Sequence, residues 1–75
     1  MAGKKFNGYL SWNAWNLCLW ISNDEGLYAL AKECKRDYQP RAVAAEQFMR
    51  DVGSKSTPDG APWSKTNVAL AMGQL

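Results

Sequence analysis

The chain has 75 residues, a formal net charge of +2 at neutral pH and no histidine. Its length allows one small domain, and four tryptophans, three tyrosines and two phenylalanines supply the bulk that so small a core needs. The lack of histidine removes the commonest metal ligand and general base, and the small net charge argues against a nucleic-acid binder that is driven by charge alone.

The first residues of the chain are polar. Residues 1–8 read MAGKKFNG, and we expect them to form a flexible arm. No apolar run of the kind found in a targeting segment follows them. The longest apolar-rich stretch, residues 9–21, is shorter than the roughly 20 residues that cross a bilayer. We therefore expect a soluble intracellular protein without membrane attachment.

A first helix is predicted to begin at Ser11, whose hydroxyl can cap the free amides of the first turn, and to end at Ser22-Asn23. Most of its circumference is apolar, and three large residues fall on one stripe: Trp12, Trp15 and Leu19. A helix without a polar face has to be enclosed by other elements, so we expect this helix to form the centre of the core.

A second helix is predicted directly after the first. Ser22 and Glu25 have the spacing of a capping box, in which the two side chains satisfy free backbone amides reciprocally. The acidic turn at Asp24 and Glu25 lacks the further oxygen ligands of a calcium loop, so helix capping accounts for it. Apolar residues then follow at helical spacing: Leu27, Leu30, Ala31, Cys34 and Tyr38.

A third helix is predicted between a proline and a glycine. Gln39-Pro40 ends the second helix, because the residue before a proline is pushed out of the helical region, and Pro40 suits the first position of the next. Gly53 is the natural stop of this third helix. Its buried side is predicted to carry Phe48 and Val52.

Residues 54–62 are predicted to form a loop before a short last helix. Thr57-Pro58-Asp59-Gly60 suits a type I turn, with proline and glycine at their favoured positions. Trp63 is too large to stay in water, so we expect it to fix the loop to the core. Ser64 can cap the last helix, whose apolar residues are Val68, Ala71 and Met72.

These patterns predict an all-α fold, a compact bundle of three to four short helices that forms a single domain over residues 1–75. Cys18 and Cys34 fall inside helical patterns without a CxxC spacing, so we expect two buried free thiols. The residues expected to be buried together are Trp15, Leu19, Leu27, Leu30, Cys34, Phe48 and Val52.

Trp12, Asn16 and Trp20 are spaced i, i+4 and i+8, so an asparagine lies between two indoles on one face of the first helix. Such a face is typical of a binding surface, where tryptophan anchors a partner or stacks on bases. It is also typical of a core helix whose buried amides, here Asn13 and Asn16, bond to nearby backbone. We favour the core interpretation, with one tryptophan left exposed.

A basic group lies where the second helix ends and the third begins: Lys32, Lys35, Arg36 and Arg41, with Tyr38 among them. Nucleic acid would bind to such a group, but Glu33 and Asp37 interrupt it, and a helix dipole also favours cations at a helix end. The candidate partner-binding residues are Trp12, Trp20, Lys32, Lys35, Arg36, Tyr38 and Arg41. No nucleophile motif and no glycine-rich phosphate loop appear, so we expect no catalytic residue, no metal and no cofactor.

Two segments resemble the signature of a family of small proteins that bacteriophages and other mobile elements encode. Residues 15–28, WNLCLWISNDEGLY, are similar to the family's TWNVALWINNDEGLY motif, and residues 57–63, TPDGAPW, are similar to its TPDGxxW motif. Leu17-Cys18 departs mildly from the pattern. The family is uncharacterised, and the resemblance implies a phage or mobile-element origin and action inside bacterial cells.

A compact helical domain without catalytic groups acts through its surface. We therefore expect the protein to bind a protein of the bacterial host in the host cytoplasm, most concretely as an inhibitor of a defence system such as an anti-CRISPR. One alternative is a structural or assembly factor of the phage. Another is an accessory protein that binds nucleic acid through Lys32, Lys35, Arg36, Arg41 and Lys55.

Overall fold

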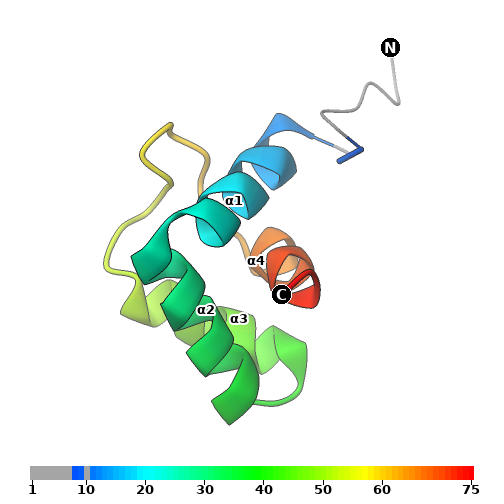
Figure 1. The fold of residues 1–75 in the computed structure, drawn as a ribbon, viewed down its shortest axis with the longest axis vertical. Coiled ribbons are helices and arrows are strands. Elements are labelled where there is room, and N and C mark those ends of the chain that lie inside the picture. The colour runs from blue at the N-terminus through cyan, green and yellow to red at the C-terminus, as the bar shows by residue number, and fades with distance from the viewer. Residues whose placement is uncertain (1–7, 10) are drawn as a thin grey trace.

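The computed structural model describes residues 8, 9 and 11–75, and these residues fold into four helices (Figure 1). In chain order the helices are α1 (Trp12–Asn23), α2 (Glu25–Asp37), α3 (Arg41–Asp51) and α4 (Lys65–Gly73). The predicted all-α bundle of three to four short helices is thereby confirmed. The arm predicted for residues 1–8 lies, apart from Gly8, outside the described residues. None of the described helices is long and apolar enough to cross a membrane.

Side chains cap the helices at two of the predicted positions. The Ser11 hydroxyl accepts a hydrogen bond from the amide of Ala14 over 3.1 Å at the start of α1. The Ser64 hydroxyl accepts one from the amide of Asn67 over 3.2 Å at the start of α4. Each bond satisfies an amide that has no partner within its own helix.

The junction between α1 and α2 differs from the predicted capping box. Asp24 is the only residue between the two helices, and its carboxylate accepts from the amide of Leu27 over 3.0 Å. Ser22 lies inside α1, so its hydroxyl donates back to the carbonyl of Cys18 over 2.6 Å. The prediction that Ser22 caps α2 is wrong, because α1 extends past it. Pro40 likewise lies one position before its predicted place, at the N-cap of α3.

The core is built from one side of each helix and from the loop that precedes α4. Phe48, at 0% exposure, is its largest fully buried side chain. Trp63 stands edge-on to Phe48, with ring centroids 5.3 Å apart and 76° between the ring planes. This contact confirms that Trp63 fixes the loop to the core. Cys18 and Cys34 are buried and free, as predicted.

The side of α1 that enters the core is not the predicted one. Trp15 and Leu19 are half-buried, and among the described residues neither belongs to the core cluster or packs against it. Helical periodicity did not identify the inner side, because α1 is apolar almost all round. Leu27, Leu30 and Val52 pack against the edge of the core without being fully buried. The buried apolar residues of α1 are Ala14, Leu17, Cys18 and Ile21.

The connection between α3 and α4 folds back on itself. Gly53 follows α3 with a φ of 78°, a left-handed conformation that glycine adopts without strain. A hydrogen bond of 2.9 Å from the amide of Gly60 to the carbonyl of Thr57 closes the predicted turn. The amide of Trp63 donates to the carbonyl of Lys55 over 3.1 Å, so the two sides of the loop run antiparallel. The turn at its tip is therefore held in a fixed position.

Candidate functional site

A hydrogen-bond network joins α1 to the tip of the loop. Asn16 and Thr57 are buried, and the Thr57 hydroxyl donates to Asn16 Oδ1 over 2.6 Å. Asn16 Nδ2 donates to Asp59 Oδ2 over 2.9 Å. The indole N–H of Trp20 donates to the same carboxylate oxygen, also over 2.9 Å. The side of α1 that carries Asn16 and Trp20 is therefore occupied by the loop of the same chain.

This network changes the interpretation of the tryptophan-rich face. Asn16 is buried as predicted, but its amide bonds to side chains 41 and 43 residues away and not to nearby backbone. Asn13 is exposed, so it is not the second buried amide that the core interpretation included. Trp20 is half-buried and bound to Asp59, which gives it a role within the fold. Trp12 is 36% exposed and lies at the start of α1.

The Asp59 network makes stability depend on pH in a predictable direction. Hydrogen bonds from Asn16 and Trp20 hold the pKa of Asp59 below its ordinary value, because both donors favour the charged carboxylate. A carboxylate with a lowered folded-state pKa stabilises the folded protein above the unfolded-state pKa, about 4, and the contribution is lost as the pH falls through the folded-state value.

We therefore expect wild-type protein to lose more stability than Asp59→Asn when the pH is lowered from about 6 to about 3. Thermal unfolding followed by circular dichroism at several pH values measures this difference. Asp51→Asn is the matched control for removal of a carboxylate, since Asp51 lies outside the network, at the end of α3. Parallel pH profiles for wild type and Asp59→Asn would contradict the assignment.

Two cations of the predicted basic group lie close to the end of α4. Lys35 Nζ donates to the carbonyl oxygen of Leu75 over 2.9 Å. Arg41 lies so close to Gly73 that a Cβ added there would stand 2.8 Å from Arg41 Nη1. Both cations therefore lie at the C-terminal end of α4, where the free carbonyls and the helix dipole attract positive charge. The sequence suggested that a helix dipole favours these cations. The dipole concerned is that of α4, a helix distant from them in sequence.

Arg36 is partly neutralised by its neighbour. Its Nε lies 2.8 Å from Asp37 Oδ1, and both side chains are exposed. The hydrogen bond between them raises the pKa of Arg36 and lowers that of Asp37. A pair so accessible to water adds little to stability. It does offset the charge that Arg36 presents to a partner.

Lys32 lies beside an aromatic residue that the sequence patterns did not single out. Its Nζ stands 5.4 Å from the ring centroid of Tyr28, one turn earlier on α2. Tyr28 is 38% exposed, so the ring and the ammonium form one accessible feature. No described carboxylate forms a salt bridge with Lys32. The i, i+4 spacing of the two residues in the sequence could have indicated that their side chains lie next to each other on the helix.

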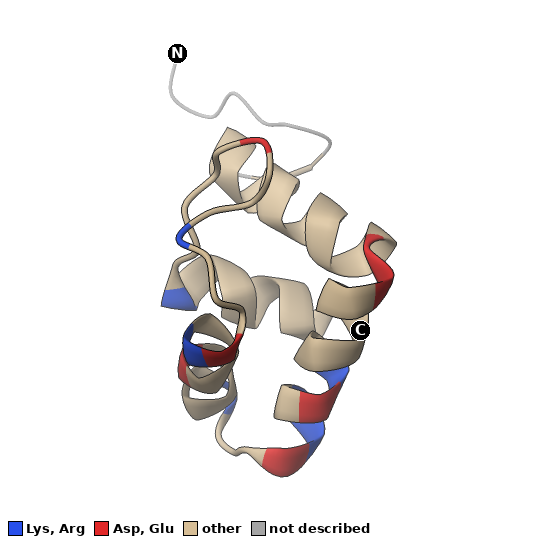
Figure 2. Ribbon diagram, turned by 90° about the vertical axis from the view of Figure 1, so that its left-hand side faces the viewer, with Lys and Arg blue, Asp and Glu red and all other residues tan. Residues whose placement is uncertain are grey.

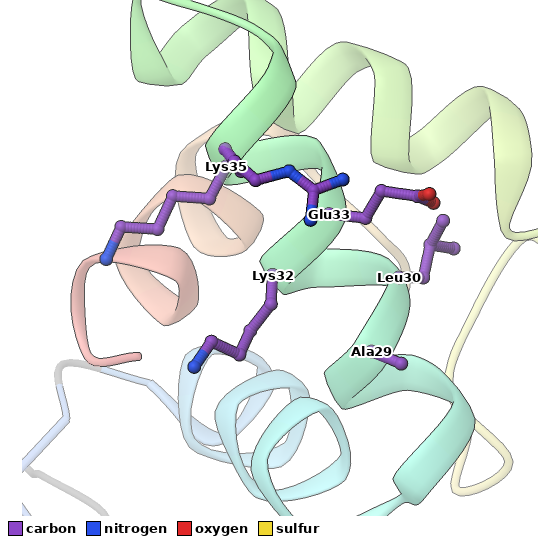
Figure 3. A pocket seen from close by; sticks show the side chains of 6 residues that line it. Ala29, Leu30, Lys32, Glu33 and Lys35 are labelled. Atoms are coloured by element: carbon purple, nitrogen blue, oxygen red, sulfur yellow. The ribbon is translucent and has the colours of Figure 1, made fainter.

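Two hollows lie along these side chains. The larger hollow, of about 810 Å³, lies along the outer side of α2. Lys32 and Lys35 extend to one side of the helix there, and Leu30 and Glu33 extend to the other (Figure 3). All of its lining residues come from α2, so it is an open surface that suits a macromolecule better than a small ligand. The other hollow, of about 250 Å³, lies at the α2–α3 corner and is lined by Lys35, Tyr38, Gln39, Pro40 and Arg41.

The thiols and the acidic side chains were considered for nucleophilic chemistry and for metal binding. Burial raises the pKa of the Cys18 and Cys34 thiols, which keeps them protonated and poorly nucleophilic at neutral pH. The described residues hold no group of three or more histidine, cysteine, aspartate or glutamate side chains that could bind a metal ion. What they present to solvent is aromatic rings next to cations, as at Tyr28 and Lys32.

A comparison with known protein families finds a match. The model of a family of unknown function, DUF7249, matches residues 2–75. The matched region includes both segments that meet around Asp59. No curated protein and no solved structure matches the chain.

Proposed function

Because the chain belongs to a family of unknown function, DUF7249, its activity has to be inferred from its surface, and we propose that it acts by binding a protein of a bacterial host. In this proposal a bacteriophage or another mobile element encodes the protein, which acts in the host cytoplasm. Its most concrete form is an inhibitor of a defence system, as an anti-CRISPR is. The resemblance of residues 15–28 and 57–63 to a phage-family signature supports this origin.

The observation that carries the proposal is the pair of Tyr28 and Lys32 on the outer side of α2. An exposed aromatic ring with an accessible cation 5.4 Å from its centroid supplies an apolar anchor and a charge in one place. Interfaces concentrate binding energy in such aromatic residues, while charges steer the encounter. The positive charge of Lys32 favours a partner surface that carries carboxylates.

The structure weakens the alternative of nucleic-acid binding. Of the basic group, Lys35 and Arg41 lie at the end of α4, and Arg36 pairs with Asp37. Binding to a phosphate backbone depends on many cations that act together. Lys32 and the exposed Lys55 are the remaining cations of that alternative, a small electrostatic footprint, so binding of nucleic acid is an outcome of the experiment below.

The test is capture of a binding partner from a nuclease-treated lysate of the bacterium in which the gene or its phage resides, followed by binding kinetics with the captured protein. We expect Lys32→Glu to slow association about tenfold at low salt, with a penalty that shrinks as salt is added. Tyr28→Ala should speed dissociation, because it removes the anchor. Lys55→Glu is the matched control, since it makes the same charge change on an exposed loop residue.

Two results would contradict the proposed function or its binding surface. Tight binding of the purified protein to random DNA and RNA near physiological salt, with no protein captured, would replace the proposal with a nucleic-acid accessory role. Equal effects of Lys32→Glu and Lys55→Glu would show that the outer side of α2 is not the binding surface.

A further inference from the structure

The surface of helix α1 can be divided into three sides, and two of them contact other parts of the protein. One side packs in the core and a second carries Asn16 and Trp20, which the loop holds. Three residues spaced i, i+3 and i+7 make up the third side, opposite the core: Trp12, Trp15 and Leu19. This third side is called the outer stripe below.

The core leaves the outer stripe uncovered. Trp12 is 36% exposed, and Trp15 and Leu19 are half-buried. Among the described residues, none of the three belongs to the core cluster or packs against it. Large apolar side chains that lie together outside a core mark surfaces that bind other molecules. Two of the three are tryptophans, the residue type most enriched at the centres of protein interfaces.

Two cations of α2, Lys32 and Lys35, lie on the side of that helix that is nearest to the outer stripe (Figure 3). Helix α1 carries no charged residue, as Figure 2 shows. On the neighbouring helix α2, Lys32 extends toward α1, and Lys35 lies on the same side with its Nζ held by Leu75 (Figure 3). Tyr28, next to Lys32, is exposed. The outer stripe with its neighbouring cations would be complemented by a partner surface that has an apolar row and carboxylates along one edge.

We propose that the outer stripe, together with Lys32, binds an acidic amphipathic segment of the partner protein. The apolar side chains of that segment pack on Trp12, Trp15 and Leu19, and its flanking carboxylates face Lys32. Amphipathic helices commonly bind in this way, through apolar residues at i, i+3, i+4 and i+7. This inference rests on the proposed function, because it specifies the partner's chemistry at the same face of the molecule.

A second copy of the chain is a poorer occupant of this stripe. In a two-fold pair the same patch lies on both sides of the interface, so each Lys32 would face an α1 that carries no carboxylate. Lys32 would then find no complementary charge on the facing α1. An acidic segment supplies that complement, which is why the proposal commits to it.

The experiment is a titration of ¹⁵N-labelled full-length protein with two synthetic amphipathic peptides. Both carry leucine at i, i+3, i+4 and i+7; one has glutamate on its flanks and the other has lysine. We expect the glutamate peptide to bind about tenfold more tightly at low salt and to shift the indole N–H signals of Trp12 and Trp15. Trp63, at 8% exposure and bonded to Ser54, is the internal control whose signal should not move.

Variants locate the binding surface. Trp12→Ala should weaken the glutamate peptide's binding, and Lys32→Glu should reverse the preference between the two peptides. Leu70→Ala, a change of similar kind at a residue 43% exposed on α4, should leave binding unchanged. Equal affinity for both peptides, binding that Leu70→Ala weakens as much as Trp12→Ala, or self-association in sedimentation that Trp12→Ala abolishes would overturn the inference.

Failure of the inference and failure of the proposed function remain distinguishable. If a host protein is captured and its binding depends on Tyr28 and Lys32 but not on Trp12, the proposed function stands and the outer stripe is not its docking surface. If no host protein is captured, the proposed function itself fails, together with the inference that rests on it.

Discussion

Replacing Trp63 with alanine is expected to lower the free energy of unfolding by about 3–5 kcal/mol. The indole is 8% exposed, packs edge-on against Phe48 and donates its N–H to the Ser54 hydroxyl over 3.1 Å. Its loss would leave a cavity in the core and free the loop that the ring fixes. Chains of this size are stable by about 4–11 kcal/mol, so the variant should lie close to unfolding at room temperature.

Urea denaturation followed by far-ultraviolet circular dichroism measures this change without relying on tryptophan fluorescence. Trp12→Ala is the matched control, because it removes the same side chain from a position outside the core. We expect Trp12→Ala to lower the free energy of unfolding by much less than Trp63→Ala, because Trp12 is 36% exposed and Trp63 only 8%. Similar losses for both variants would mean that Trp12 packs inside the protein and that the outer stripe is wrongly assigned.

The ends of the helices were the most predictable part of the fold. The caps at Ser11 and Ser64 and the glycine after α3 depend on bonds and backbone angles within a few residues, which the sequence displays directly. The α1–α2 junction was less predictable, because Ser22 and Asp24 both suit an N-cap. The length of α1 selects Asp24, and that length depends on packing against the rest of the protein.

The inner side of α1 was not predictable from its own sequence. In α2 the charged and the apolar residues lie on different faces of the helix, so the spacing of the apolar residues showed which face is exposed to solvent. In α1 almost every position is apolar, and the stripe of Trp12, Trp15 and Leu19 fits the helical period as well as the true core side does. Only the contacts of α2, α4 and the loop determine which side is covered.

The cations near the end of α2 could be located from the sequence, but their contacts could not. The pattern located Lys32, Lys35, Arg36 and Arg41 near one helix end, yet Lys35 bonds to a residue 40 positions away in the chain. Such pairings depend on how α4 packs, which no local motif encodes. The sequence did not identify Tyr28 as a candidate binding residue, because that role depends on the exposure of its ring beside Lys32, which only the structure shows.

The second large effect is expected at Asn16. Asn16→Ala should lower the free energy of unfolding by about 1–3 kcal/mol, because it leaves the buried Thr57 hydroxyl without its acceptor and removes one donor from Asp59. Asn13→Ala is the matched control: the residue lies on the same helix, is exposed and should contribute within about 0.5 kcal/mol. Chemical denaturation of both variants measures the difference.

A double-mutant cycle separates this network from simple loss of packing. Asn16 and Asp59 share one hydrogen bond of 2.9 Å, so the effects of Asn16→Ala and Asp59→Ala should be non-additive by about 0.5–3 kcal/mol. Trp20 still donates to Asp59 when Asn16 is absent, so Asp59→Ala should remain destabilising in the Asn16→Ala background. Additive effects would show that the hydrogen bond between Asn16 and Asp59 does not contribute to stability. Coupling would show that α1 fixes the turn through the side that carries Asn16 and Trp20.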